Sequence, residues 1–89
     1  MTNKSKSIYN RALNVLTGGV SRNTIFRKPH PLYVAKAKGS YIKDVDGIER
    51  IDFANNMASL IHGHSHPKII QAVTEQLKKG TAYTMGSEI

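Results

Sequence analysis

The chain of 89 residues contains no cysteine, no tryptophan and only three prolines. Without cysteine it can form neither a disulfide nor a thiolate metal site, which is compatible with a reducing cytosol. A long apolar run is also missing, because charges interrupt the only apolar stretch near the N-terminus, residues 1–16. We therefore expect neither a signal peptide nor a membrane span, and predict a cytoplasmic protein with no membrane partner.

Acidic residues are scarce: six Asp and Glu stand against 13 Lys and Arg, for a net charge of +7. A small basic module that binds nucleic acid or another polyanion is therefore one open interpretation. The basic residues are dispersed from Lys4 to Lys79, however, with no run longer than two and no interleaved aromatic residues. This pattern favours a basic solvated surface and no nucleic-acid partner.

The clearest structural signal is a pair of β-prone runs, residues 41–45 and 48–53, on either side of Asp46-Gly47. Asp-Gly favours a tight type I′ hairpin turn, in which both central residues have positive φ. A further β-prone run, residues 32–35, is separated from the hairpin by the breaker Gly39-Ser40. We predict a three-stranded antiparallel meander over about residues 32–53.

Helices are predicted on both sides of the meander. The first spans about residues 5–16 and ends at Thr17-Gly18-Gly19, before a loop over 17–31. After a linker over 54–65, a second helix spans about 66–79. It begins at Pro67, which suits a first turn, and ends at Gly80. Its apolar residues recur at helical spacing: Ile69, Ile70, Val73 and Leu77. The fold class is therefore α+β.

Five motifs occur in a fixed order along the chain. They are an N-terminal helix, Gly18-Gly19-Val20, Gly39-Ser40-Tyr41-Ile42-Lys43-Asp44-Val45-Asp46-Gly47, Ile51-Asp52-Phe53 and Gly63-His64-Ser65-His66-Pro67. Together they resemble the opening of the class III pyridoxal-phosphate (PLP) aminotransferases, and within that family they resemble the branch of glutamate-1-semialdehyde aminomutases and β-amino-acid aminotransferases. The resemblance extends from about Ser7 onward.

The resemblance implies the N-terminal part of a fold-type I PLP enzyme, without its large PLP-binding domain. Such an enzyme transfers an amino group between an amino acid and a keto acid or semialdehyde, and is a homodimer. Family members are several times longer, so we expect a fragment that is inactive alone. In the family, the Schiff-base lysine and the other main cofactor contacts come from the large domain. An interaction segment that pairs with a larger subunit is a further alternative.

Arg22, with Ser21 beside it, is the best candidate for substrate binding, in the loop that the resemblance places on the substrate side. A guanidinium offers a bidentate fork to a carboxylate. β-Amino-acid aminotransferases carry a carboxylate-binding arginine three residues after the second glycine of this loop, which matches Arg22. The aminomutase arginine follows an Asn-Ser-Pro-Val sequence that is absent here. The alternative is a solvated surface arginine, which is also the favoured interpretation of Arg27.

Asn56 and Met57 are the second pair of candidates. The resemblance implies that they line the substrate pocket, since aminomutases usually have a tryptophan at the position of Met57. Methionine keeps the apolar bulk but loses the ring and its N–H donor. The alternative, given equal weight, is that Met57 fills a core and the asparagines satisfy turn backbone.

No catalytic residue and no metal ligand is predicted in this chain. His62, His64 and His66 have a two-residue spacing that is a weak metal signal, and no cysteine or carboxylate accompanies them. Asp44 and Asp46 are interpreted as hairpin and turn residues rather than as an acid/base pair, and so is Asp52.

Overall fold

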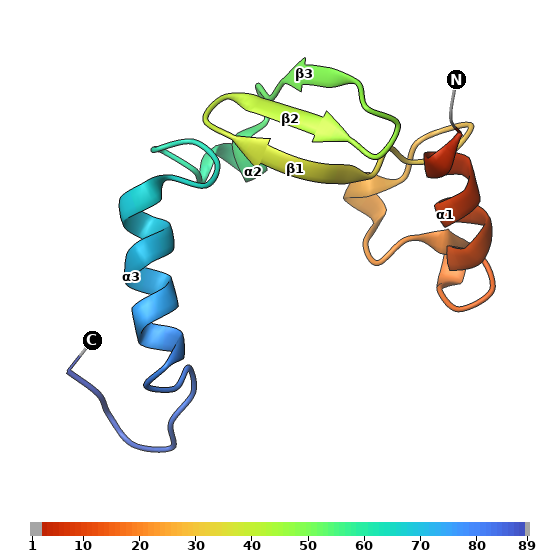
Figure 1. The fold of residues 1–89 in the computed structure, drawn as a ribbon. Helices are drawn as coiled ribbons and strands as arrows, with labels where there is room; N and C mark the ends of the chain where they lie inside the picture. Colours follow the sequence, from red (N-terminus) through yellow and green to blue (C-terminus); the bar gives the residue numbers. More distant parts are fainter. Residues whose placement is uncertain (1–2, 89) are drawn as a thin grey trace.

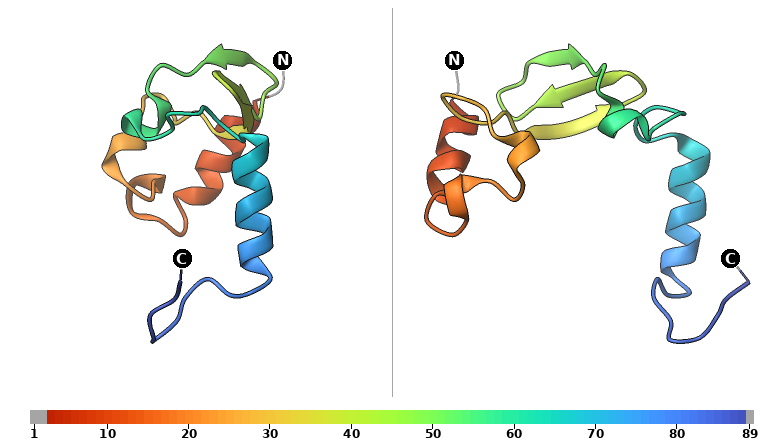
Figure 2. Two further views of the ribbon diagram at one scale, coloured as in Figure 1. Left: turned by 90° about the vertical axis from the view of Figure 1, so that its left-hand side faces the viewer. Right: turned by 180° about the vertical axis from the view of Figure 1, so that it is seen from behind.

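The computed structural model describes residues 3–88 of the chain, which form an elongated body of 46 × 29 × 22 Å (Figure 1). A three-stranded sheet lies in the middle, with one helical region beyond each end (Figure 2). The elements in chain order are α1 (Lys4–Ala12), the 3₁₀ turns η1 (Thr17–Gly19) and η2 (Asn23–Ile25), β1 (Val34–Lys38), β2 (Tyr41–Asp44), β3 (Glu49–Ile51), α2 (Asn55–Ala58) and α3 (Pro67–Leu77).

The sheet has the order β1-β2-β3, and both pairs are antiparallel, which confirms the predicted meander and the α+β class. Lys43 on the central strand lies opposite Lys36 on β1 and Glu49 on β3. The acidic neighbour on one side offsets the like charge on the other. The pairing of β1 with β2 is irregular between Val34 and Lys36.

The predicted type I′ turn is wrong. Gly47 has φ of 91°, but Asp46 does not lie in the positive-φ region. The hairpin instead has a three-residue loop, closed by hydrogen bonds from Gly47 N to Asp44 O (3.1 Å) and from Asp44 N to Ile48 O (3.0 Å). The Asp44 carboxylate also accepts from the backbone N–H of Asp46 (3.0 Å) and Ile48 (2.8 Å). These bonds favour a wider loop that leaves the left-handed position to glycine alone.

The first helix is shorter than the predicted span of about 5–16, because α1 ends at Ala12. Hydrogen-bonded turns continue to Leu16, and the chain then reverses at Gly18 (φ 66°) and Gly19 (φ 73°). Gly19 packs directly on Tyr9, where a Cβ would lie 2.5 Å from the ring. The helix therefore ends at Ala12, and the residues that follow fold back against it.

The second long helix, predicted over about 66–79, is α3. Its start is capped by His66, whose Nδ1 accepts from Lys68 N (3.3 Å), and Pro67 is the first helical residue. At its end Gly80 (φ 114°) donates to Gln76 O (3.1 Å). Within residues 3–88, α3 contacts no other helix or strand, and it projects away from the sheet in all views (Figures 1 and 2).

Within the described part of the chain Pro31 is fully buried, but no aliphatic or aromatic side chain is, so these residues form no hydrophobic core of their own. The apolar face of α3 is exposed to solvent along its whole length: Ile69, Ile70, Val73 and Leu77. The helices described here are all too short or too polar to traverse a lipid bilayer.

Candidate functional site

The most unusual backbone of the chain lies in the segment predicted as a linker over 54–65. All four residues of α2 have positive φ, between 51° and 64°, so this turn is left-handed. It is closed by hydrogen bonds from Ala58 N to Ala54 O (2.9 Å) and from Ser59 N to Asn55 O (3.1 Å). Left-handed helical geometry costs roughly 1–2 kcal/mol for each residue other than glycine, and less for asparagine. The first two residues of the turn are asparagines, which adopt positive φ at a lower energetic cost. Met57 and Ala58 adopt it at the full cost.

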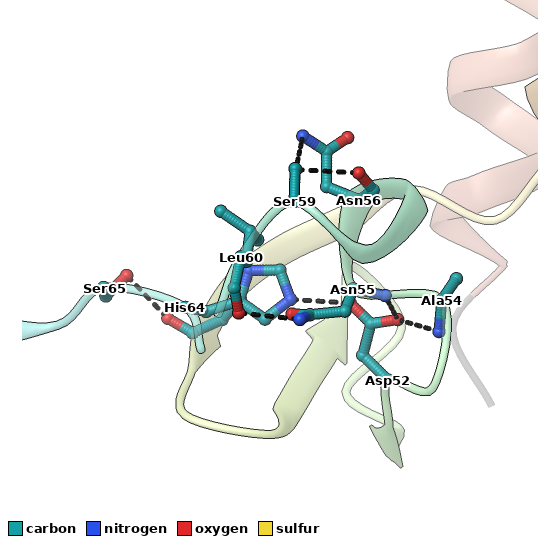
Figure 3. A network of polar contacts seen from close by, with 9 residues as sticks. Asp52, Ala54, Asn55, Asn56, Ser59, Leu60, His64 and Ser65 are labelled. Carbon is teal, nitrogen blue, oxygen red and sulfur yellow. Dashed lines mark hydrogen bonds and ion pairs between the residues drawn. The ribbon is translucent and has the colours of Figure 1, made fainter. Parts of the chain in front are cut away.

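A polar network supports the start of this left-handed turn (Figure 3). Asp52 Oδ1 accepts from the backbone N–H of Ala54 (3.0 Å) and Asn55 (2.9 Å). Asp52 Oδ2 accepts from His64 Nε2 at 2.6 Å. Both side chains are largely shielded, with 15% of Asp52 and 19% of His64 exposed. The carboxylate therefore joins the end of β3, the turn and the segment before α3.

The end of the left-handed turn is held by its own side chains (Figure 3). Asn55 Nδ2 donates to Leu60 O (2.6 Å). Ser59 Oγ donates to Asn56 O (2.8 Å) and accepts from Asn56 Nδ2 (3.1 Å). Each bond crosses from the turn to the residues that follow it, which keeps the strained backbone from unwinding.

His64 is anchored to the sheet through its backbone. It forms an isolated antiparallel bridge with Gly39, with both N–H···O distances at 2.9 Å. Next to it, Ser65 Oγ donates to Ala37 O (2.9 Å). Gly63 lies so close to Gly39 that a Cβ would be 2.9 Å from the Gly39 carbonyl oxygen. The histidine thus reaches Asp52 from a fixed point on the β1–β2 turn.

The hydrogen bonds lower the pKa of Asp52 from its usual value. The largest contribution is the backbone N–H of Asn55, followed by the His64 side chain, and together they outweigh desolvation. Asp52 is therefore a carboxylate at neutral pH, and accepts hydrogen bonds on both oxygens.

Two of the predicted site residues, Ser21 and Arg22, lie between η1 and η2, where both side chains are exposed. The Arg22 guanidinium forms no hydrogen bond or ion pair with any described residue, and is free to meet a ligand from solvent. The second loop arginine, Arg27, instead donates to the carbonyls of Thr24 (3.1 Å) and Phe26 (2.9 Å). These bonds give Arg27 a structural role within the loop.

The other two predicted residues, Asn56 and Met57, lie in the left-handed turn. The Met57 side chain is 82% exposed, so it fills no core that this chain forms. Within residues 3–88, α2 makes no contact with η1 or η2. The structure therefore presents two separate candidate surfaces, one at Arg22 and one at Met57, and does not join them by itself.

The remaining aspartates lie at the hairpin loop, as the sequence predicted, and they also bond partners that it did not predict. Asp44 is 4% exposed and pairs with Arg50, and this bond is the largest cause of its lowered pKa. Asp46 accepts from the backbone N–H of Lys4 (2.6 Å) and Ser5 (3.2 Å), and so caps α1 from the hairpin loop. Desolvation raises the pKa of Asp46, but these hydrogen bonds together lower it. The Asp46-Gly47 pair predicted the turn, but the local sequence could not predict that Asp46 contacts the start of α1.

The lysines and histidines within residues 3–88 are the residues that could hold a cofactor or a metal ion in this chain. A Schiff-base lysine needs a desolvated or charge-flanked position. The lysines here lie exposed on helices, strands and loops, except Lys43, which is half-buried in the hairpin. No group of three histidines, cysteines or carboxylates within residues 3–88 could hold a metal ion. The rings of His62 and His66 are tilted by 56° relative to each other, with centroids 5.5 Å apart.

Comparison with known proteins gives a consistent match. The family model described as aminotransferase class-III matches residues 24–87. The glutamate-1-semialdehyde 2,1-aminomutase of Methanothermobacter thermautotrophicus is 42% identical over 85 residues, which cover 96% of this chain and 20% of that protein. The chain thus spans about a fifth of the length of the curated relatives that it matches.

Solved structures also match nearly the whole chain. A transaminase with PLP bound superposes with a TM-score of 0.93 and 43% identity, covering 99% of this chain and 21% of that one. A β-phenylalanine aminotransferase from Variovorax paradoxus gives 0.86 and 30%, covering 94% and 20%. The motifs, the meander and the match over residues 24–87 agree, and the chain belongs to the class-III aminotransferase family.

Proposed function

We propose that this chain is the substrate-side, N-terminal segment of a PLP-dependent enzyme that transfers an amino group between an amino acid and a keto acid or semialdehyde. The observation that carries the proposal is the class-III aminotransferase match over residues 24–87. A transaminase with PLP bound that shares the fold of nearly the whole chain supports the same cofactor here. PLP would supply an electron sink for the amino transfer. The enzyme that we propose is a cytoplasmic homodimer.

We assign Arg22, Ser21, Met57 and Asn56 to the substrate, because the resemblance places the main PLP contacts in the large domain. Arg22 is unpaired within residues 3–88, follows the Gly18-Gly19 reversal and can offer two parallel N–H donors to a substrate carboxylate. Met57 and Asn56 would line the opposite part of the pocket, with Ser21 beside Arg22. The 30% identity to a β-phenylalanine aminotransferase supports a β-amino acid as one substrate class.

The test of the function is amino transfer by the full-length enzyme that contains this segment. With PLP added, it should move an amino group from β-phenylalanine or another amino acid to a keto acid or semialdehyde. Conversion of glutamate 1-semialdehyde without an external acceptor would instead identify an aminomutase. If a folded enzyme that has bound PLP performs neither reaction, the proposed function is wrong.

Arg22→Ala tests the substrate contact. Loss of a charge-assisted, bidentate contact should raise the KM for a carboxylate-bearing donor by about tenfold to a hundredfold, or roughly 1.5–3 kcal/mol. The KM for an amine without a carboxylate should not change. Arg27→Ala is the matched control, because Arg27 lies in the same loop but bonds only backbone carbonyls. An unchanged KM for the carboxylate donor in Arg22→Ala would remove the proposed role.

A further inference from the structure

The left-handed turn at 55–58 needs outside support, because four consecutive residues in this conformation do not persist unaided. Asp52 supplies that support at the start of the turn, where it accepts from two successive backbone N–H groups. Its second oxygen is occupied by His64 Nε2 at 2.6 Å. The direction of the turn therefore depends on where this carboxylate is held.

Both members of the Asp52–His64 pair are tied to the turn between β1 and β2. Asp52 N donates to Ser40 O (2.8 Å), and His64 is bridged to Gly39 in both directions at 2.9 Å. Asp52 and His64 thus meet from two segments that are each tied to the β1–β2 turn. Figure 3 shows the His64 ring directed at the Asp52 carboxylate, with the turn beginning immediately beyond it.

The Asp52–His64 pair and the Met57 side chain differ greatly in solvent exposure. The paired side chains are 15% and 19% exposed, whereas Met57 in the turn is 82% exposed. A strained backbone with a shielded polar anchor and an exposed apolar tip is the arrangement expected where a side chain must be presented to a ligand. Met57 packs against no core within residues 3–88, so its side chain is available to a surface outside them.

We infer that Asp52 and His64 are positioning residues that set where Met57 meets the substrate, by holding residues 55–58 in the left-handed turn. The inference rests on the proposed function, because it deepens the assignment of Met57 to the substrate pocket. Neither Asp52 nor His64 touches the substrate. Their effect is on which substrate side chain is accepted, and it passes through the backbone of the turn.

The test uses the full-length enzyme and the variants Asp52→Asn and His64→Gln. The readout is the ratio of kcat/KM for β-phenylalanine to that for β-alanine, or for phenylalanine to alanine if only α-amino acids react. Asp52→Asn should change this ratio about tenfold, since a displaced apolar contact is worth that much discrimination. His64→Gln should change it less, because the glutamine amide can still donate to Asp52.

Two second-site changes separate positioning from a general loss of stability. In a Met57→Ala background, Asp52→Asn should leave the ratio unchanged, since the side chain being positioned is gone. In an Ala58→Gly background the effect of Asp52→Asn should shrink, because glycine adopts φ of 64° without strain. His62→Gln is the matched control: His62 is exposed and contacts the His66 ring rather than Asp52.

A readout that does not depend on activity is the amide exchange of Ala58 and Ser59, the donors that close the turn. Asp52→Asn should speed it about tenfold. The inference is overturned if the substrate ratio of a folded Asp52→Asn enzyme equals that of the wild type. If Asp52→Asn does not fold, His64→Ala, which removes the donor to Asp52, takes its place, and an unchanged ratio with unchanged exchange in that variant overturns the inference equally. An inactive wild type with faster exchange in the variant would contradict the proposed function and leave the role of the pair in the turn supported.

Discussion

At the scale of single residues, the aspartates hold the segment together. Asp44 secures the hairpin loop, Asp46 caps α1 and Asp52 supports the left-handed turn, and each accepts from backbone N–H groups. The sequence predicted all of these as turn residues, because Asp favours turns. It could not predict their partners, since Asp46 meets a helix about 40 residues away in the chain and His64 reaches Asp52 only once the sheet has formed.

The lowered pKa values of Asp44 and Asp52 predict how stability changes with pH. A carboxyl group whose folded pKa is depressed contributes stability above its unfolded pKa of about 3.9. That contribution is lost as the pH falls through the lower folded pKa. We expect urea unfolding of the full-length enzyme to show falling stability below about pH 4. Asp44→Asn should flatten this dependence, whereas Glu75→Gln, on the exposed side of α3, should not.

The cap of α1 by Asp46 is a second residue-scale prediction. Asp46→Ala removes both acceptors from the Lys4 and Ser5 N–H groups, so the first turn of α1 should fray. Amide exchange of Ser7, whose N–H bonds Asn3 O, should rise about fivefold. Asp46→Asn keeps one acceptor oxygen and should show a smaller rise. Equal exchange in Asp46→Ala and wild type would mean that the cap has no role in solution.

At the scale of elements, the predictions succeeded where local pattern decides the outcome. The meander followed from β-prone runs and breakers, and α3 from Pro67, helical spacing and Gly80. They failed where a tertiary contact decides: α1 ends early because Gly19 packs on Tyr9, and the hairpin loop widens because the Asp44 carboxylate bonds inside it. The left-handed turn had only a faint signal, the pair Asn55-Asn56, which tolerates positive φ.

The bridge between Gly39 and His64 yields an element-scale prediction with a built-in control. A Cβ added at Gly39 would contact no other atom, so Gly39→Ala should lower the stability only by the cost of positive φ, roughly 1 kcal/mol. Gly63→Ala bears the same conformational cost at φ of 76°, and its Cβ also meets the Gly39 carbonyl at 2.9 Å. We expect Gly63→Ala to lower the melting temperature of the full-length enzyme clearly more than Gly39→Ala does. Equal effects would show that the close approach has no energetic weight.

At the scale of the whole molecule, the absence of any buried aliphatic or aromatic side chain within residues 3–88 is decisive. Hydrophobic burial is the main favourable term in folding, and the described residues leave most of their apolar side chains in solvent. The 89-residue chain alone should therefore show no cooperative unfolding transition in urea, followed by circular dichroism, and should bind the dye ANS. A sharp two-state transition of the monomer would contradict this expectation.

The candidate site could be predicted only in part from the sequence of this chain, because the chain holds only part of the pocket that we propose. The resemblance located Arg22 and Met57, but the structure leaves them on separate surfaces, and the matched relatives are about five times longer. A pocket that includes both needs walls from elsewhere in the enzyme that we propose. The Asp52–His64 pair was not predicted, because each residue had a sufficient local explanation in the sequence: a turn for Asp52 and a helix entrance for His64.

The order of the strands has a consequence for biosynthesis. Each strand of the meander pairs with its immediate neighbour in the chain, so the sheet closes through short loops once residue 51 has left the ribosome. Local pairings of this kind form quickly, because little loop entropy is lost. The meander and the Asp46 cap can therefore assemble during translation, while the apolar face of α3 is still exposed. In the longer enzyme that we propose, this face would stay uncovered until later residues are made, and the nascent chain would then bind chaperones.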